Sequence, residues 1–492
     1  MPDIPSAHHP VTLADLRALG SLEVRGAAGT EIDDVTHDSR TVGPRTLFAC
    51  RPGLTADGHD FAPEAVRRGA AALLVERILD IDVPQVRVDS VARALGPVSA
   101  RVHGHPSRDL TTVGVTGTNG KTTTAHLLEA AFRASGAKSG LIGTVETRVG
   151  GRTLEGVRTT PESTDLQRLL RRMADEAVTA VAMEVSSHGL SLGRVRGTHF
   201  SAAIFTNLTQ DHLDFHRDME EYFEAKASLF APEYADLGVV NIDDPYGRRL
   251  VERASIDVVT VSPSGEVPAD VRADDVEAGP RGTDLLACLR GGSVPVRTGL
   301  VGDFTVANVL GALAALEAVG IDRDDAAAGI AALKGVPGRM ERVEAGQALT
   351  VLVDYAHTPD SVDHVLATAR KLTRGRVIVV LGSGGDRDRG KRPLMGHAAA
   401  AGGDLAIFTS DNPRSEDPLA IIGDMAAGAE GAGAYETCPD RREAIRRAVT
   451  TAGEDDVVLV VGKGHEQTQE VAGVHHPFDD REVAHDLLKG GA

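Results

Sequence analysis

Short apolar runs that end in polar or glycine-rich residues recur along this chain of 492 residues. Such Val- and Ile-rich runs are typical of strands buried on both faces of a parallel sheet. Alanine-rich helical patterns, such as TTAHLLEAAFRASG and FTVANVLGALAALEAVG, separate them and predict α/β domains. The runs are TTVGVTGTNG at 111, TAVAMEVSSHG at 179, SAAIFTNLTQDH at 201, LTVLVDYAHTPDS at 349, RVIVVLGSGGDRDRG at 376, DLAIFTSDNPRSEDP at 404 and DVVLVVGKGHE at 456.

The polar cluster follows the apolar run in every one of these segments. In parallel α/β sheets ligands bind outside the carboxyl ends of the strands. We therefore expect all of these clusters to lie at ligand-binding edges.

Two breaks divide the chain. A Pro-containing linker, HGHPSRDL, precedes the strand at 111, and a Pro-Gly break in LKGVPGRMERV follows a long helical pattern. These breaks predict three domains, residues 1–108, 109–337 and 338–492, each of ordinary size.

Composition narrows the class of partner. The formal net charge is −19, which argues against nucleic acid or an anionic membrane as a partner. Cys50, Cys288 and Cys438 are far apart and are expected to be reduced thiols. The N-terminus lacks a secretion pattern and no run of about 18 apolar residues occurs, so we expect a cytoplasmic protein.

The stretch GVTGTNGKTTT at 114–124 combines a glycine turn with the start of a helix, which makes a phosphate site. Lys121 is placed to reach nucleotide phosphates, and the Thr122 hydroxyl to hold Mg²⁺. The glycines stand at 114, 117 and 120, and Val115 departs from the common pattern. A chance glycine turn is the simpler alternative, and nucleotide binding is favoured.

Two further strand ends carry candidate metal ligands. Glu184 in MEVSSHGL is a carboxylate at a strand end, and His212 follows another strand beside Asp211. A cap or surface charge for Glu184 and a structural role for His212 stay open. Lys226 in YFEAKASLF is an ordinary helix lysine by its spacing.

Eight motifs occur in the order found in the Mur ligases, and the chain resembles that family from THDSRTV near residue 36 to GKGHEQ near 467. The resemblance implies a three-domain α/β fold with a P-loop-type central ATPase domain and a Rossmann-like C-terminal domain. The motifs are GVTGTNGKTTT, MEVSSHGL, FTNLTQDHLDFH, YFEAKASLF, VDYAHTPDS, GSGGDRDRGKRPLMG, DNPRSEDP and GKGHE.

The resemblance also implies which residues bind ATP and Mg²⁺. Lys121, Glu184, His212 and Lys226 would be catalytic. Thr122 and Glu184 would hold one metal, and His212 and Lys226 a second, with Lys226 carbamylated to N6-carboxylysine. The implied ATP contacts are Gly117, Thr118, Asn119, Gly120, Lys121, Thr122, Thr123, Asn308, Arg339 and Asp354.

The implied substrates are UDP-N-acetylmuramoyl-L-alanyl-D-glutamate and an amino acid. ATP would phosphorylate the D-Glu carboxylate, and an amine would attack the acyl phosphate, in peptidoglycan precursor synthesis. We expect a monomer. The contacts implied for the UDP-muramoyl-dipeptide are His37, Ser39, Leu54, Thr55, Ala56, Thr159, Thr160, Ser186, Leu192 and Arg194. Arg158, Leu192, His37, Leu54 and Thr55 depart from side chains seen in other members.

The stretch DNPRSEDP indicates which amino acid supplies the amine. A guanidinium at the end of the LAIFTS strand can hold a carboxylate with two hydrogen bonds. Diaminopimelate has one carboxylate more than lysine, so Arg414 would favour it, and the family's diaminopimelate-adding members carry this Arg. The meso isomer is favoured over LL. A loop charge paired with Glu416 or Asp417 is the simpler role for Arg414. The implied amine contacts are Arg387, Asp411, Asn412, Pro413, Arg414, Gly462 and Glu466, of which Glu466 would take an ammonium.

Three alternatives stay open. A lysine-adding Mur ligase is the nearest alternative within the fold, although lysine-adding members generally lack the Arg found here at position 414. A folylpolyglutamate synthetase-like ligase would usually lack the first domain. A non-enzymatic nucleotide switch would bind ATP without substrate-dependent turnover.

Overall fold

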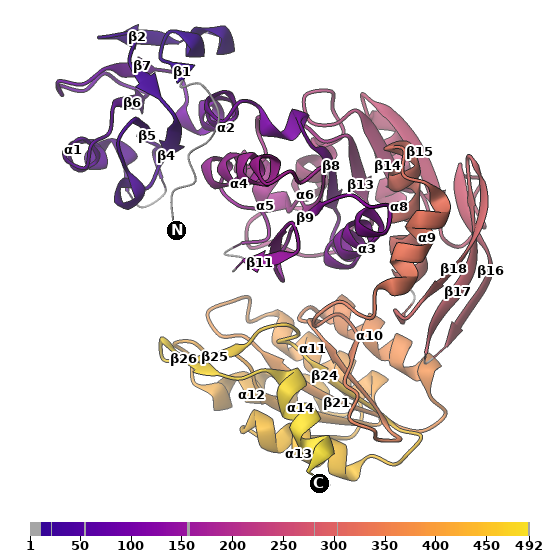
Figure 1. Ribbon diagram of the computed structural model, residues 1–492. Coiled ribbons are helices and arrows are strands. Elements are labelled where there is room, and N and C mark those ends of the chain that lie inside the picture. Colours follow the sequence, from indigo (N-terminus) through magenta and orange to yellow (C-terminus); the bar gives the residue numbers. More distant parts are fainter. Residues whose placement is uncertain are drawn as a thin grey trace.

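The structure, a computed structural model, describes residues 11–20, 22–53, 56–154, 158–279, 281–302 and 304–490. The chain forms three lobes, each built on its own main sheet (Figure 1). The predicted boundaries fall between these sheets: one follows a short 3₁₀ helix, Pro106–Arg108, and the other lies between α9 and β19. The boundaries themselves stay a prediction. Within the described residues no helix is long and apolar enough to cross a membrane.

The first lobe is a five-stranded sheet in the order β2-β7-β6-β5-β4, with β1 and β3 paired beside it. Helix α2 packs on one face with Leu13 and Leu16, and α1 covers the other face. The elements are β1 Val11–Thr12, β2 Glu23–Arg25, β3 Glu31–Ile32, β4 Asp34–Thr36, β5 Thr46–Ala49, α1 Ala62–Arg67, β6 Ala72–Val75, β7 Gln85–Arg87 and α2 Val91–Val102.

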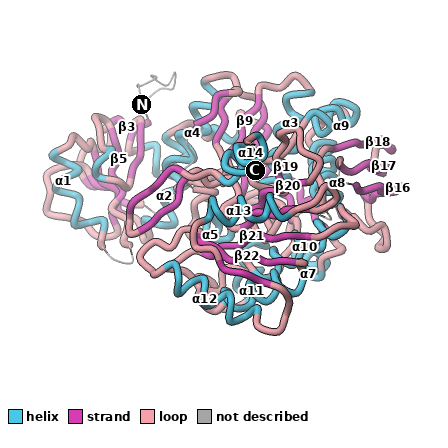
Figure 2. The backbone as a smooth tube through the Cα atoms, turned by 90° about the horizontal axis from the view of Figure 1, so that it is seen from below, coloured by secondary structure: helices cyan, strands magenta, loops and turns pink. Residues whose placement is uncertain are grey.

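The central lobe is an eleven-stranded sheet in the order β11-β10-β9-β12-β8-β13-β14-β15-β16-β17-β18. Its strands are β8 Thr111–Thr116, β9 Ser139–Ile142, β10 Thr147–Val149, β11 Arg152–Leu154, β12 Ala180–Glu184, β13 Ala202–Phe205, β14 Leu237–Asn241, β15 Asp257–Ser262, β16 Val271–Gly279, β17 Gly282–Leu289 and β18 Gly292–Thr298. The antiparallel strands β16–β18 form the edge farthest from the first lobe (Figure 2).

Helices cover both faces of the central sheet. Helices α3, α8 and α9 pack on one face, and α4 and α6 lie on the other. Helix α8 is apolar on nearly all sides and buried along most of its length, as expected for a core helix. The helices are α3 Lys121–Ala134, α4 Ser163–Asp175, α5 Ser187–Ser191, α6 Met219–Ala227, α7 Pro245–Arg253, α8 Phe304–Ala318 and α9 Arg323–Ala332.

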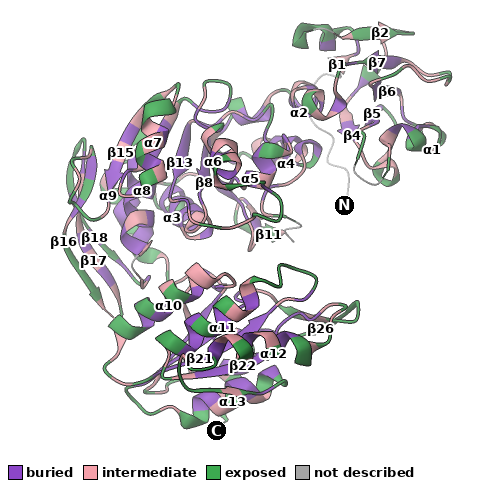
Figure 3. Cartoon of the chain, turned by 180° about the vertical axis from the view of Figure 1, so that it is seen from behind, coloured by how far each residue is buried: buried purple, intermediate pink, exposed green. Residues whose placement is uncertain are grey.

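The C-terminal lobe is a six-stranded sheet in the order β19-β20-β24-β21-β22-β23. Helices α10, α11 and α12 cover one face, α13 and α14 the other, and the buried strands lie between them (Figure 3). The elements are β19 Glu341–Arg342, β20 Thr350–Asp354, α10 Pro359–Leu372, β21 Val377–Ser383, α11 Lys391–Gly402, β22 Leu405–Ser410, α12 Pro418–Ala429, β23 Tyr435–Thr437, α13 Arg441–Thr451, β24 Val457–Val461, β25 Thr468–Val471, β26 Val474–Pro477 and α14 Asp480–Lys489.

All seven apolar runs singled out from the sequence are strands: β8, β12, β13, β20, β21, β22 and β24. They are paired in parallel within their sheets. The polar clusters that follow them consequently lie at the carboxyl edges of two sheets, and the α/β fold class is confirmed.

Candidate active site

A cleft of about 650 Å³ lies between the central and C-terminal lobes. Residues predicted to bind ATP, metal and the muramoyl-dipeptide line it together. They are Thr118, Asn119, Gly120, Lys121, Thr122, Thr123, Thr159, Thr160, Glu184, Ser186, Arg194, His212, Lys226, Asn308, Arg339 and Asp354. Arg387 also lines it, whereas the other predicted amine contacts do not.

The turn between β8 and α3 requires two of its glycines. Gly117 has φ +146° and Gly120 has φ +89°. A Cβ at Gly117 would lie 1.9 Å from Thr206 Oγ1, and one at Gly120 would lie 2.3 Å from Asn308 Oδ1. Gly114 instead lies within β8 against the ring of Phe200, so it serves packing and is not part of the turn.

Lys121 lies at the start of α3 and folds back over this turn. Its Nζ donates to the carbonyl oxygens of Gly117 and Thr118, both at 2.9 Å. Burial lowers the pKa of Lys121, while Glu184 and Asp211 oppose that shift. The ammonium is therefore held at the phosphate turn by carbonyl groups and nearby carboxylates.

Glu184 lies at the end of β12 and is 1% exposed. Its Oε2 accepts from Thr122 Oγ1 at 3.1 Å and from Thr144 Oγ1 at 2.9 Å, and its Oε1 accepts from the Thr144 backbone N–H at 2.8 Å. A buried carboxylate needs such donors. The predicted ligands Thr122 and Glu184 are thus brought into direct contact.

Lys226 comes from α6, yet its Nζ reaches the same turn and donates to Gly117 O at 2.7 Å. The side chain is 1% exposed and lies over the Tyr222 ring at 4.7 Å. Burial, with added repulsion from Lys121, lowers the pKa of Lys226 well below its ordinary value. The environment therefore shifts this amine toward its neutral form.

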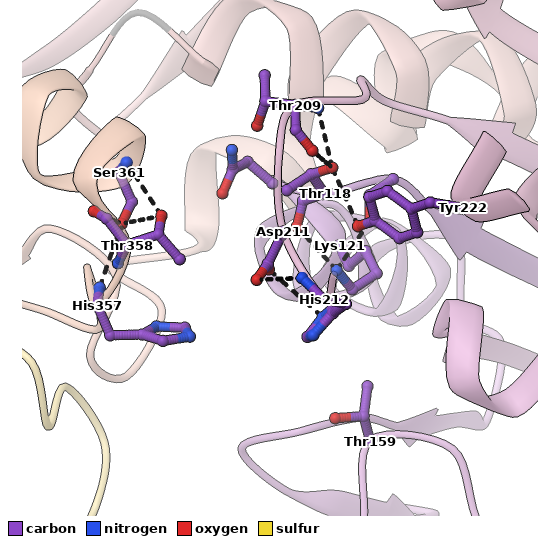
Figure 4. A network of polar contacts seen from close by, with 12 residues as sticks. Thr118, Lys121, Thr159, Thr209, Asp211, His212, Tyr222, His357, Thr358 and Ser361 are labelled. Atoms are coloured by element: carbon purple, nitrogen blue, oxygen red, sulfur yellow. Dashed lines mark hydrogen bonds and ion pairs between the residues drawn. The ribbon is translucent and has the colours of Figure 1, made fainter. Parts of the chain in front are cut away.

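His212 and Asp211 face this cluster from the loop after β13 (Figure 4). His212 has φ +55°, and its Nε2 lies 3.4 Å from Asp211 Oδ2. Burial lowers the pKa of His212 to about 4, although Asp211 opposes the shift. The imidazole is consequently neutral at physiological pH and has a lone pair available for a metal.

The C-terminal lobe brings Arg339 and Asp354 to the opposite side of the cleft. Arg339 Nη2 donates to Thr122 Oγ1 at 3.2 Å, and its guanidinium lies over the Tyr355 ring at 4.7 Å. Asp354 accepts from the backbone N–H groups of Met340 at 2.7 Å and Ala356 at 2.8 Å. Figure 4 shows His357, Thr358 and Ser361 of this lobe across from Lys121 and His212.

The predicted dipeptide contacts are joined to the metal candidates. Thr160 Oγ1 donates to Glu184 O at 3.1 Å and lies 3.1 Å from Ser186 Oγ. Thr159 Oγ1 lies 2.9 Å from Thr144 Oγ1. Arg194 Nη1 donates to Thr160 O at 3.3 Å, and its Nη2 lies 2.8 Å from Glu162 Oε1.

Several other predicted substrate contacts do not line this cleft. Leu192 does not line it, and neither do His37, Ser39 and Ala56 of the first lobe. His37 Nδ1 lies 3.4 Å from Thr164 Oγ1 of the central lobe, so it is at the junction of the two lobes. Leu54 and Thr55 lie outside the described residues.

The predicted amine contacts form a second cluster at the ends of β22 and β24. Asn412 Nδ2 donates to Glu466 Oε2 at 2.6 Å, and Lys463 Nζ lies 3.1 Å from the same oxygen. Gly462 has φ +111°, and a Cβ there would lie 2.5 Å from Asp411 Oδ2. Pro413 O would lie 2.0 Å from a Cβ at Gly385, so the DNPR loop packs directly on the GSGGDRD loop.

Arg414 does not pair with the acidic run beside it. Its Nε lies 3.3 Å from Glu470 Oε2 in β25, and its Nη1 donates to Gly385 O at 2.6 Å. Glu416 instead pairs with the buried Arg392 at 2.8 Å. The simpler role considered for Arg414 was a loop charge paired with Glu416 or Asp417. This pairing is wrong, because Arg414 pairs with Glu470 instead.

Sequence reasoning missed several groups of the site. Thr144 holds Glu184, Tyr355 holds Arg339, and Glu470 pairs with Arg414. Thr144 follows β9, whose short run SGLIG could have been read as a further buried strand. Glu470 has no comparable sequence signal, because its partner lies in a distant segment.

Comparison with known proteins agrees with this architecture. Residues 31–103 match the Mur ligase family, catalytic domain; residues 115–316 match the Mur ligase middle domain; and residues 338–464 match the Mur ligase, glutamate ligase domain. A Streptomyces coelicolor protein named UDP-N-acetylmuramoyl-L-alanyl-D-glutamate–2,6-diaminopimelate ligase is 50% identical over 470 residues, 93% of each chain.

Solved structures share the fold over nearly the whole chain. A structure described as that same ligase has a TM-score of 0.72 and 32% identity, and the match covers 98% of this chain and 99% of the other. The MurF ligase of Thermotoga maritima, solved with ADP, has a TM-score of 0.62 at 18% identity over 93% and 97% of the two chains, which is a likeness of fold. The chain belongs to the Mur ligase family.

Proposed function

We propose that the chain is an ATP-dependent ligase that joins 2,6-diaminopimelate to UDP-N-acetylmuramoyl-L-alanyl-D-glutamate, a step of peptidoglycan precursor synthesis. One observation carries the proposal: the phosphate turn lines a single cleft together with four predicted dipeptide contacts and the predicted nucleotide contacts of the last domain; the four are Thr159, Thr160, Ser186 and Arg194. The 50% identical relative bears the name of this activity. The proposed protein is a cytoplasmic monomer that uses neither nucleic acid nor membrane.

The chemistry needs cations at this point. In the proposed reaction the D-Glu carboxylate attacks the γ-phosphoryl group, the bond to ADP breaks, and an acyl phosphate forms. Lys121 would contact the phosphates and offset the repulsion between two anions at contact distance. Arg339, which already reaches Thr122, would add a second cation from the last domain.

The residues at the phosphate turn fit one Mg²⁺. Thr122 Oγ1 and Glu184 Oε2 are oxygen ligands, the kind that a hard divalent cation requires. The two atoms lie 3.1 Å apart. Bound Mg²⁺ would polarise the phosphoryl oxygens. Among the described residues no three side chains drawn from His, Cys, Asp and Glu converge as a metal site, so a second ion depends on another kind of ligand.

Lys226 would supply that ligand after carbamylation. A neutral lysine amine adds CO₂ and loses a proton to give a carbamate, and the low pKa of Lys226 favours the neutral amine. The carbamate would place an anion beside His212. As a free ammonium, Lys226 would instead repel a metal ion.

The acyl phosphate must meet the amine and not water. Arg414 and its neighbours would hold the amino acid, so that its free amine attacks the acyl carbon and phosphate leaves with the bonding electrons. Arg387, another predicted amine contact, lines the shared cleft. Closure of the last domain would bring the two clusters together and exclude water.

Phosphate release from ATP tests the proposal. The reactions contain UDP-N-acetylmuramoyl-L-alanyl-D-glutamate with meso-diaminopimelate, LL-diaminopimelate or L-lysine. Turnover with a diaminopimelate isomer, meso before LL, and none with lysine is the expected result. Turnover with lysine alone would keep the ligase and remove Arg414 as the selector. Absence of turnover with every amine would contradict the proposal and leave the folylpolyglutamate synthetase-like ligase or the nucleotide switch.

A further inference from the structure

Thr144 lies in the turn between β9 and β10, outside all eight sequence motifs, and lines the cleft. Its backbone N–H donates to Glu184 Oε1 at 2.8 Å, and its hydroxyl donates to Glu184 Oε2 at 2.9 Å. Hydrogen bonds of this kind fix how a ligand is presented to a metal. One residue therefore holds both oxygens of the carboxylate that would bind Mg²⁺.

The turn is shaped for this close approach. Gly143 N–H donates to Glu146 O at 3.1 Å and closes the turn. A Cβ at Gly143 would lie 2.4 Å from Glu184 Oε1, so a larger residue would push the carboxylate away. The contact between Thr144 and Glu184 therefore follows from the backbone of the turn and is not a chance contact of a surface side chain.

Thr144 also reaches the dipeptide side of the cleft. Its Oγ1 lies 2.9 Å from Oγ1 of Thr159, a predicted dipeptide contact that lines the same cleft. A hydroxyl group has one proton to donate, and a carboxylate only accepts. Because Thr144 gives its proton to Glu184, the proton of Thr159 is directed to Thr144. The hydrogen bonds therefore run in one direction, from Thr159 through Thr144 to Glu184.

This direction decides what Thr159 offers to a ligand. Figure 4 shows Thr159 on a loop apart from Lys121 and His212. Among the described residues no other hydrogen bond uses Thr159 Oγ1, and its proton is committed to Thr144. Only its lone pairs remain for a ligand, so Thr159 would accept from an N–H group and repel a carbonyl oxygen.

We propose that Thr144 is a positioning residue that orients the Thr159 hydroxyl to accept an amide N–H of the muramoyl-dipeptide. This inference rests on the proposed function and names the hydrogen-bonding role of one of its substrate contacts. Thr144 acts through its two neighbours. It joins the carboxylate that would hold the metal to the hydroxyl that would hold the dipeptide, so one side chain places both relative to each other.

The test measures the dissociation constant of UDP-N-acetylmuramoyl-L-alanyl-D-glutamate by calorimetry, without ATP or Mg²⁺. Thr144→Val keeps the size and the backbone N–H but removes the hydroxyl, and binding should weaken about fivefold, as for the loss of one hydrogen bond. Thr144→Ser restores the hydroxyl and should bind within about twofold of the wild-type protein. In a Thr159→Val background, Thr144→Val should have no further effect, because the group through which it acts is gone.

The dissociation constant does not depend on the fraction of folded protein, which the binding stoichiometry reports separately. Thr260→Val is the matched control, because it removes a threonine hydroxyl that donates to Asp270 Oδ2 at 2.8 Å in β15, and it should leave the constant unchanged. An unchanged constant in Thr144→Val would overturn the inference. So would an equal loss with and without Thr159, which would show that Thr144 only supports the turn. If the wild-type protein did not bind the UDP-muramoyl-dipeptide, the proposed function would fail instead.

Discussion

The two clusters of the site are held in place by different means. At the phosphate turn the central groups are buried, with Glu184 and Lys226 each 1% exposed; Glu184 accepts from Thr122 at the start of α3, and Lys226 donates to Gly117 in the turn. At the amine end, Arg414 and Glu470 are about a quarter exposed and are held by a surface hairpin. Groups that stabilise charge in the transition state must be fixed beforehand, whereas the proposed amine contacts are held partly by a hairpin that is separate from the main sheet.

The comparison becomes less sharp if the amine end also depends on a buried pair beneath its loops, and Arg441 tests this. It forms a fully buried pair with Asp480 at 2.6 Å and donates to Ser410 O at 3.3 Å and Val461 O at 3.0 Å, just before the two amine-binding loops. Arg441→Met leaves Asp480 buried without its partner, so urea unfolding should show a loss of about 3–5 kcal/mol. Arg446→Ala, at an exposed site, should change stability by less than about 0.5 kcal/mol. Equal effects would contradict the buried-pair role.

Replacement of Lys226 tests the phosphate side. Lys226→Ala should lower kcat by about 10²–10³-fold, because it removes the proposed second metal ligand. Small added carboxylates should restore part of the activity. Lys138→Ala, at an exposed lysine bonded to Glu176 O, is the matched control. Wild-type kcat in Lys226→Ala without rescue would rule out the metal role.

Replacement of Arg414 should act on one substrate only. Arg414→Ala should raise the KM for diaminopimelate about 10–100-fold, since a charge-assisted pair is lost, and should leave the KM for ATP unchanged. The measurement is steady-state phosphate release with each substrate varied in turn. Arg389→Ala removes another arginine of the same lobe, which pairs with Glu416, and should change neither value as strongly. A parallel rise in both KM values would point to a general loss of structure.

Acidification is the test from which we expect the smallest effect. Burial, together with Arg339 and Arg481, lowers the pKa of His465 to about 3, so His465 is neutral in the folded protein. Below about pH 6.5 the unfolded chain binds a proton that the folded chain does not, and stability falls as the pH drops toward 3. Between pH 6.5 and 5 the loss should be about 1.6 kcal/mol, and His465→Gln should reduce it. His475→Gln, on the exposed β26, should leave the slope unaltered, and an equal slope in both variants would exclude His465 as its source.

The sequence was informative where strands are buried on both faces. Strands β8, β12 and β20 could be predicted because their continuous apolar runs end in distinctive clusters. The hairpins of β16–β18 were missed, although β17 alternates buried and half-buried positions and a Gly-Gly turn follows it. Such alternation is a weaker sequence pattern than a continuous apolar run, so these strands were not predicted.

Prediction of the site was limited by distance along the chain. Lys121 and Thr122 could be identified from local spacing, because one turn and one helix place both. Lys226 gave no local indication and was identified from the family resemblance alone. The pairing of Arg414 with Glu470 depends on how a late hairpin returns to an earlier loop, which no local pattern encodes.

The close packing around Gly338 has a consequence for the order of events in a reaction cycle. A Cβ at Gly338 would lie 2.1 Å from the backbone nitrogen of His465, so the start of the last domain packs directly against the GKGHE loop, and we expect the two to move together. Arg339 and Asp354 belong to the first of these, and Gly462 and Glu466 to the second. A rotation that withdrew Arg339 from the proposed nucleotide site would also withdraw the proposed amine contacts. In the proposed reaction, release of ADP and admission of the next amino acid would then be one movement and not two.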